Sequence, residues 1–166
     1  MEKNKNNFNV FGKVTWLWSY SPLHRDWPIS MQSINIIPAI MHGQYVILME
    51  KGFPVAYCSW AKLDLDNEVK YIKNTNALTI DDWNSGDRNW FIDWVAPFGH
   101  SNQLYKIMRK KFPDGLFRSI RVTKNSTTGK IYEFHGGKVN KLIAKKQFLK
   151  YHHDLIQALK NLEGLK

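Results

Sequence analysis

Two side chains suited to acid–base chemistry lie close to apolar and aromatic residues in the sequence. One is Asp93, the only charged residue in 89–98, a run rich in Trp, Phe, Ile and Val. An ionised carboxylate left unpaired in such surroundings carries a large desolvation cost, so Asp93 needs a hydrogen-bonding partner or must become protonated. Active sites arrange both conditions, although a turn cap or an ion pair with a nearby Arg would also explain the residue.

The second candidate is His24, which lies between Leu23 and Trp27 in a loop bounded by Pro22 and Pro28. Imidazole titrates near ~6.5 in short peptides, so it is the side chain that exchanges protons most readily at neutral pH. The alternative reading is a packed histidine whose hydrogen bonds are purely structural. The sequence alone leaves both readings open.

Other chemical signatures fail. No Walker motif, dinucleotide-binding glycine pattern, zinc spacing or Gly-x-Ser-x-Gly sequence occurs. The acidic run at 64–68 lacks the Gly and distal Glu of a calcium loop, and Cys58 is expected to be a small core residue of a strand. Adjacent residues on a helix diverge by about 100°, so His152 and His153 cannot share one metal ion. We therefore expect no metal site and no bound cofactor.

The elements that must position His24 and Asp93 follow from periodicity. Residues 8–19 have apolar residues at helical spacing, and a short helix is expected from Pro28 to Ile34, so His24 lies in the loop between two helices. Asp93 lies near the outgoing end of a strand that Pro97 and Gly99 terminate. A helix over 101–112 follows, with Ser101 as its N-cap.

The rest of the chain predicts a single domain over residues 1–166. A hairpin is expected from 44–50 and 54–63, a short helix over 67–73, and strands at 117–123 and 131–134. A long helix over 139–162 is predicted to bury Leu142, Leu149, Ile156 and Leu159 and to expose Lys141, Lys145, Lys146 and Lys150. The order of elements indicates an α/β or α+β fold with a mixed, largely antiparallel sheet flanked by helices.

Charge is unevenly distributed along the chain. The net charge is +10, and residues 106–166 hold 15 of the 24 Lys and Arg against four acidic residues. This asymmetry indicates a surface that meets an acidic partner. No apolar run reaches the roughly 18 residues of a membrane span, the first residues are polar, and the one cysteine excludes an internal disulfide, so we expect a cytoplasmic protein.

Three separated motifs resemble one family. Ser21-Pro-Leu-His24-Arg-Asp-Trp27, Ile92-Asp93-Trp94-Val-Ala-Pro97-Phe98-Gly99 and Phe134-His-Gly-Gly137-Lys138 are similar to the RTX toxin-activating lysine acyltransferases. The resemblance covers nearly the whole chain. It implies transfer of a fatty acyl group from acyl carrier protein to internal lysines of an inactive RTX protoxin in the cytoplasm. It also implies a fold similar to the Gcn5-related N-acetyltransferases and a homodimer.

The resemblance marks the same two residues for catalysis. Lysine is almost wholly protonated at neutral pH, so acyl transfer to it needs a general base, which we expect to be His24. Asp93 would orient the imidazole and stabilise its charged form. Backbone N–H groups around Gly99 and Ser101 are expected to stabilise the oxyanion. A two-step route, in which His24 itself carries the acyl group, stays open.

The basic half of the chain fits an acidic carrier protein. The pyrophosphate-binding loop of the acetyltransferases is missing, which favours a protein-borne donor over acyl-coenzyme A. Arg121 is the best candidate for a phosphopantetheine or carrier contact, within a cationic face predicted to comprise Lys106, Arg109, Lys110, Lys111, Arg118, Arg121 and Lys124. A basic nucleic-acid-binding module and a non-catalytic toxin-binding protein are the rival readings, but no nucleic-acid recognition motif supports the first.

Overall fold

The computed structural model describes residues 2–121 and 129–164. Its elements are α1 (Glu2–Tyr20), α2 (Ser30–Asn35), α3 (Ile37–His42), β1 (Tyr45–Glu50), β2 (Phe53–Leu63), α4 (Leu65–Lys73), the 3₁₀ turn η1 (Asp81–Trp83), β3 (Arg88–Val95), α5 (Ser101–Lys111), β4 (Leu116–Arg121), β5 (Lys130–His135) and α6 (Lys141–Gly164). The predicted α+β class is confirmed. Residues 122–128, which include the predicted contact Lys124, lie outside the described part.

The five strands form one sheet in the order β1-β2-β3-β4-β5. Pairing is antiparallel except between β3 and β4, which run parallel because α5 connects them as a crossover. The sheet is therefore mixed and largely antiparallel, as predicted, and is consistent with the fold of the Gcn5-related N-acetyltransferases. None of the described helices has the length and apolarity needed to cross a membrane.

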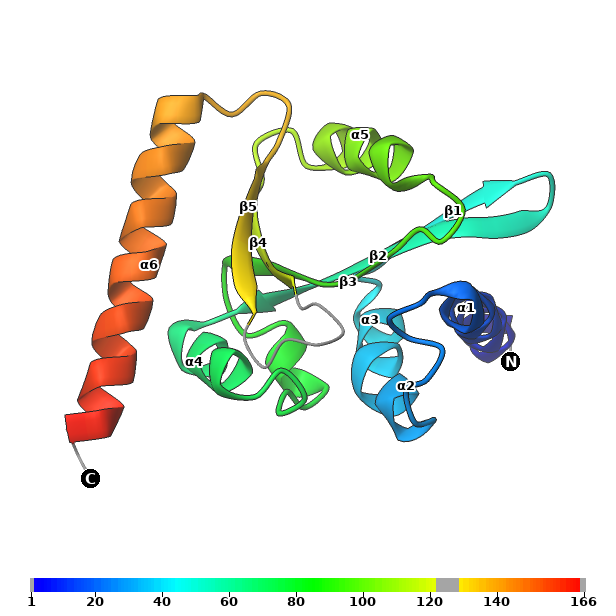
Figure 1. Cartoon of the computed structure of the whole chain (residues 1–166), viewed down its shortest axis with the longest axis horizontal. Coiled ribbons are helices and arrows are strands. Elements are labelled where there is room, and N and C mark those ends of the chain that lie inside the picture. The colour runs from blue at the N-terminus through cyan, green and yellow to red at the C-terminus, as the bar shows by residue number, and fades with distance from the viewer. Residues whose placement is uncertain (1, 122–128, 165–166) are drawn as a thin grey trace.

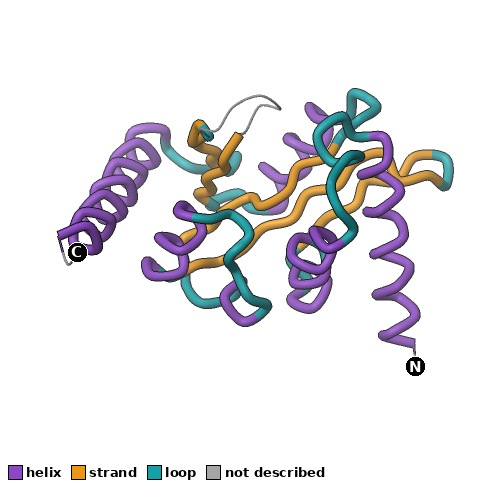
Figure 2. Tube along the Cα trace, turned by 60° about the horizontal axis from the view of Figure 1, so that its bottom comes forward, coloured by secondary structure: helices purple, strands orange, loops and turns teal. Residues whose placement is uncertain are grey.

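Helices cover both faces of the sheet (Figure 1). On one face, Leu104 and Met108 of α5 pack on residues of β2, β3 and β4. On the other face, Val14 and Leu17 of α1 pack on the β2–β3 region, and α3 and α4 cover the neighbouring part. The long helix α6 stands at the β4–β5 end of the molecule, and α1 lies at the opposite end (Figures 1 and 2).

The helix α3 was not predicted from the sequence. Pro38 occupies its first turn, where a missing N–H costs nothing, and Gly43 ends it in the left-handed conformation at φ 63°. Six residues with two buried aliphatic side chains are too short a pattern to separate a helix from a connecting loop.

The predicted inner face of α6 is wrong. Of the four residues predicted to be buried, Leu142, Leu149 and Ile156 are exposed and Leu159 is half-buried. The side chains that pack inward are Ala144, Phe148 and Leu155. Polar contacts fix this orientation: Arg88 donates to the carbonyl oxygen of Tyr151 at 2.8 Å and to Asp154 at 3.4 Å. The long helix carries apolar residues on two sides, and the sequence does not show which side meets the sheet.

Arg118 was also misplaced in the predicted cationic face. It is almost fully buried, pairs with the fully buried carboxylate of Glu68, and lies over the ring of Trp90 at 4.5 Å. Arg88 donates to the same carboxylate at 2.6 Å. Burial lowers the pKa of Arg118, although the charge of Glu68 opposes this shift. The cluster joins α4, β3, β4 and α6 and is structural.

The third motif has a packing explanation. A Cβ atom on Gly136 would collide with the carbonyl oxygens of Phe112 and Pro113, which close the end of α5. The backbone N–H of Gly136 donates to Gly115 at 2.8 Å, and that of Lys138 donates to Pro113 at 2.8 Å. The motif therefore attaches the segment after β5 to the segment after α5.

Candidate active site

The two predicted catalytic residues lie in direct contact. Nε2 of His24 is 2.9 Å from Oδ1 of Asp93. Both are buried, with 4% of His24 and 8% of Asp93 exposed, so the contact is shielded from bulk water. His24 comes from the loop after α1, and Asp93 from the part of β3 that this loop covers.

Three donors converge on the Asp93 carboxylate. In addition to His24, the indole N–H of Trp18 donates to Oδ2 at 2.8 Å, and the backbone N–H of Trp94 donates to Oδ1 at 3.0 Å. Such a set satisfies the hydrogen-bonding capacity of a buried carboxylate. The carboxylate is therefore held in place by α1 and β3 independently of His24.

The imidazole of His24 is held on its other side as well. Its Nδ1 lies 2.6 Å from the hydroxyl oxygen of Ser21, and Trp27 packs edge-on to the ring at a centroid distance of 4.6 Å. A hydroxyl can either donate to or accept from Nδ1. Because Nε2–H donates to Oδ1 of Asp93, Nδ1 of the neutral ring accepts from the hydroxyl of Ser21.

A cavity of about 830 Å³ opens beside this pair. Parallel pairing between β3 and β4 covers only Asn89–Phe91 and Phe117–Ser119, and the cavity is lined by the residues of both strands just beyond, from Ile92 to Trp94 and from Ile120 to Arg121. Helices on both sheet faces contribute, with Met31 of α2 on one side and Tyr105 of α5 on the other. The gap between the parallel strands thus connects the two faces of the sheet.

The cavity brings four of the predicted site residues together: His24, Asp93, Ser101 and Arg121. The hydroxyl of Ser101 accepts from the indole N–H of Trp94 at 3.0 Å. Gly99 does not line the cavity, and its N–H donates to Ala96 at 3.3 Å. Of the two predicted oxyanion donors, only Ser101 is therefore presented to the cavity.

Arg121 marks the side of the cavity under α5. Phe117 packs beneath α5, and Arg121 lies four residues further along the same strand, so strand alternation directs both to this side. The guanidinium of Arg121 lies 4.8 Å from the ring centre of Tyr132, which also lines the cavity. The arginine is exposed at the cavity's margin and is accessible to an anionic group.

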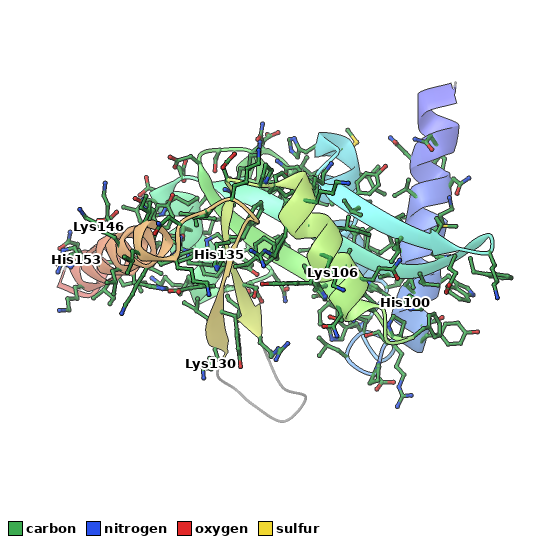
Figure 3. The ribbon with its side chains drawn as sticks, turned by 90° about the horizontal axis from the view of Figure 1, so that it is seen from above. His100, Lys106, Lys130, His135, Lys146 and His153 are labelled. Carbon is green, nitrogen blue, oxygen red and sulfur yellow. The ribbon has the colours of Figure 1, made fainter. Side chains whose placement is uncertain are left out.

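The other predicted cations lie on α5 and outside the cavity wall. Lys106 and Lys110 are exposed, and Figure 3 shows Lys106 projecting from α5. Arg109 is half-buried, with its guanidinium 3.5 Å from the carbonyl oxygen of Gly136. The cationic surface is therefore smaller than predicted: Lys106, Lys110, Lys111 and Arg121 remain exposed on it.

The structure does not support a cysteine nucleophile or a metal ion at this site. Cys58 is fully buried, and burial together with the charge of Asp93 raises the pKa of its thiol, so it does not supply a thiolate. Within residues 2–121 and 129–164, no three His, Cys, Asp or Glu side chains come close enough to hold a metal ion. Asp64 caps α4 through the N–H of Asn67 at 2.8 Å.

Sequence reasoning missed two residues of the site, Trp18 and Ser21. Trp18 looked like one more apolar position of a helix, and only the fold shows that its indole N–H points at Asp93. Ser21 was part of the first motif, three residues before His24, a spacing at which a hydroxyl can return to the ring across one turn of loop. That spacing was the available signal.

Comparison with known proteins agrees with the motifs. The model of the RTX toxin acyltransferase family matches residues 3–135. A leukotoxin-activating lysine-acyltransferase of Aggregatibacter actinomycetemcomitans is 62% identical over 161 residues, covering 97% of this chain and 95% of its own. An RTX-I toxin-activating lysine-acyltransferase of Actinobacillus pleuropneumoniae is 56% identical over 166 residues (100% and 96%), and a protein-lysine myristoyltransferase of Escherichia coli is 56% identical over 159 residues (95% and 94%).

Proposed function

Because this chain belongs to the RTX toxin acyltransferase family, we propose that it transfers a fatty acyl group from acyl carrier protein to lysine side chains of an RTX protoxin in the cytoplasm. The enzyme is a protein-lysine acyltransferase. Acyl carrier protein as the acyl donor and the catalytic roles of His24 and Asp93 are our proposals. The observation that carries the proposal is the buried contact between His24 and Asp93 at the wall of a cavity that passes between two parallel strands.

His24 is the general base. The side chain of a solvated lysine titrates near ~10.4, so its ammonium must lose a proton before the nitrogen can attack. To act as a base, the neutral imidazole moves its proton from Nε2 to Nδ1, which then donates to the hydroxyl of Ser21. The incoming ammonium lies between Nε2 of His24 and the carboxylate of Asp93 and donates to both. The proton ends on the imidazole, and the ionised Asp93 stabilises the resulting imidazolium.

The bond changes are those of a single acyl transfer. The lysine nitrogen bonds to the thioester carbonyl carbon, the C–S bond breaks, and the phosphopantetheine sulfur leaves as a thiolate. The thiolate takes up the second proton that the nitrogen loses on becoming an amide, and the imidazolium of His24 releases the first proton to solvent. The carbonyl oxygen becomes negative in between, and Ser101 at the cavity wall is the remaining predicted donor to it. No bound cofactor takes part.

The competing route makes the imidazole itself the acyl carrier. Nucleophilic attack would require Nε2 to turn from Asp93 toward the thioester, because its other nitrogen is occupied by Ser21. The two routes differ in one observable: an acyl-enzyme gains the mass of the acyl chain when the donor is present and the protoxin is left out.

The two substrates approach from opposite faces of the sheet. Arg121 and the exposed lysines of α5 form a cationic entrance on one face, which suits an acidic carrier protein and its phosphodiester. His24 and Asp93 lie on the face covered by α1 and α2, so the lysine arrives from there. Leu23, Trp27 and Met31 line the intervening cavity and suit an aliphatic chain.

Intact-mass spectrometry of protoxin tests this function. Protoxin is incubated with the enzyme and either acyl-loaded carrier protein or acyl-coenzyme A, and the modified residues are located by peptide mapping. The proposal predicts a fatty acyl mass on lysine with the carrier donor and little with coenzyme A. Equal rates with both donors would refute the carrier requirement, and no product with either donor would refute the function.

The family resemblance also implies a homodimer. It stays a prediction, and sedimentation velocity of the purified enzyme is the measurement that decides it.

A further inference from the structure

The outer side of α6 carries apolar side chains that nothing in the described chain covers. Leu142, Leu149 and Ile156 recur every seven residues and are 79%, 61% and 50% exposed. Residues seven apart on a helix differ by only about 20° in direction, so these three side chains form one line, the outer stripe. Aliphatic residues aligned in this way are typical of a helix that meets a second element.

The helix cannot bury this stripe by rotating about its own axis. Phe148 and Leu155 lie about 100° around the helix from Leu149 and Ile156 and pack inward. Arg88 binds both the carbonyl oxygen of Tyr151 and the carboxylate of Asp154. His152 adds a contact to Glu133 of β5 at 2.9 Å. The outer stripe is therefore a fixed feature of the surface.

Charge around the stripe defines what it can meet. Lys145, Lys146, Lys150 and Lys160 are exposed on the same helix. Asp154 is the one acidic side chain that the structure describes in α6, and it faces inward to Arg88. If two copies of this face met, their lysines would repel one another. A partner helix that has a line of apolar side chains flanked by acidic ones would complement both the outer stripe and its lysines.

Position separates the two possible acidic partners. Figure 1 shows α6 at one end of the molecule, and Figure 3 shows Lys146 and His153 projecting there, far from Lys106 on α5 and from His100 at the other end. A carrier protein docked on this outer side would have its prosthetic arm pointed away from the cavity. A long protein acceptor could bind here with one segment while another segment reaches His24.

We propose that the outer stripe of α6 is a docking site for an acidic amphipathic helix of the protein acceptor, distinct from the segment that carries the modified lysine. This inference rests on the proposed function, because it presumes a protein acceptor. The site would hold the acceptor by apolar burial along Leu142, Leu149 and Ile156 and by the flanking lysines, and its contribution would weaken with salt.

Binding and kinetics of Leu149→Glu test the site. Affinity for unacylated protoxin is measured by biolayer interferometry without any acyl donor. The variant is expected to bind at least about tenfold more weakly and to raise the KM for protoxin similarly, with kcat and the KM for acyl carrier protein unchanged. Lys146→Glu should act in the same direction and lose much of the salt dependence. Phe8→Glu, at a residue 76% exposed on α1, is the matched control and should leave protoxin binding unchanged.

Several results would overturn the docking site. Unchanged protoxin affinity in Leu149→Glu would do so, as would a rise in the KM for the carrier in place of that for protoxin. A wild-type dimer that Leu149→Glu converts to monomer without loss of protoxin affinity would assign the stripe to self-association. If Leu149→Glu lost binding to phosphatidylglycerol vesicles but kept its affinity for protoxin, the outer stripe would be a membrane-binding surface. If the wild type acylates protoxin and the variant does so equally well, only the docking site fails; if the wild type acylates no protoxin, the proposed function fails with it.

Discussion

Trp18 donates its indole N–H to Oδ2 of Asp93 at 2.8 Å, from the last turns of α1. The contact leaves Oδ1 to accept from Nε2 of His24 and from the backbone N–H of Trp94. Because the indole and the imidazole bind different oxygens, the carboxylate has a fixed direction before either substrate arrives. Preorganisation of this kind is what makes a hydrogen bond effective in catalysis, since no reorientation is needed during the reaction.

Trp18→Phe tests this anchoring. The variant keeps an aromatic ring but removes the donor, and a hydrogen bond to a charged group contributes about 1.5–3 kcal/mol, so kcat should fall about 10–100-fold with little change in either KM. Single-turnover acylation followed by mass spectrometry gives the rate. Trp16→Phe, on the same helix but without a contact to Asp93, should keep the wild-type rate. An unchanged rate in Trp18→Phe would show that the indole is only a packing element.

Arg121→Ala and Arg118→Ala separate a binding arginine from a structural one. Arg121 is exposed at the cavity, so its loss should raise the KM for acyl carrier protein about 3–10-fold and leave the melting temperature unchanged. Arg118 is buried against Glu68, so its loss should destabilise the fold by about 3–5 kcal/mol. Urea unfolding and initial rates measure the two effects. If Arg118→Ala raised the KM for acyl carrier protein and left the stability unchanged, Arg118 would belong to the surface that binds the carrier protein.

Gly136→Ala and Gly137→Ala probe the contact after β5. A methyl group on Gly136 meets two backbone carbonyl oxygens, which cannot move without displacing the end of α5, so we expect a loss of about 2–4 kcal/mol. A methyl group on Gly137 lies 3.5 Å from the nearest such atom, an ordinary contact, and should cost under about 1 kcal/mol. Thermal unfolding measures both. Similar losses in the two variants would contradict the packing explanation.

Asp82→Asn should destabilise the fold in a pH-dependent way. Burial of Asp82 acts to raise its pKa, but hydrogen bonds from Lys70 at 2.6 Å and from the N–H of Thr79 at 2.7 Å outweigh it and lower the pKa. A carboxyl whose pKa is lowered by folding stabilises the protein above its unfolded value of ~3.9, and this stabilisation disappears as pH falls through the folded value.

The expected difference in melting temperature between wild type and Asp82→Asn is about 1–3 °C at pH 7, because the ion pair is partly exposed to solvent. It should vanish in strong acid, below the folded pKa. Asp81→Asn is the matched control, since the neighbouring Asp81 is exposed, and should show no such trend. A constant difference across the pH range would mean that the amide substitution acts through packing.

Much of the fold was predictable because, within most helices and strands, apolar residues recur at the spacing typical of that element. The strand around Asp93, the turn at Gly99 and the helix near Ser101 each have local signals, and the structure has them within a residue or two. The predicted N-cap is wrong, because His100 occupies that position and Ser101 is the first residue of the helix. The β1–β2 hairpin was also found. The family resemblance indicated that Asp93 orients His24, but whether the two touch in the resting enzyme could not be predicted, because periodicity does not bring a loop and a distant strand together.

The errors have a common physical cause. The alternation of apolar and basic residues along β4 predicted which residues share a face with Arg118. It did not predict that Glu68 and α6 cover that face. In α6, Leu149 and Phe148 are equally good candidates for burial by type, and the choice was made by Arg88 and its contacts to Asp154 and Tyr151. Both outcomes depend on tertiary ion pairs, which leave no periodic trace in the sequence.

A double-mutant cycle on His24 and Asp93 decides whether the two residues act together as one base. Single-turnover rates of lysine acylation are compared for the wild type, His24→Gln, Asp93→Asn and the double variant, each shown to be folded by its thermal transition. If the two residues act as one base, each single change should lower the rate by about 10²–10⁴, and the double variant should be no slower than His24→Gln. Losses that multiply would show that the two residues act independently, and a His24→Gln variant with the wild-type rate would show that His24 is not the base.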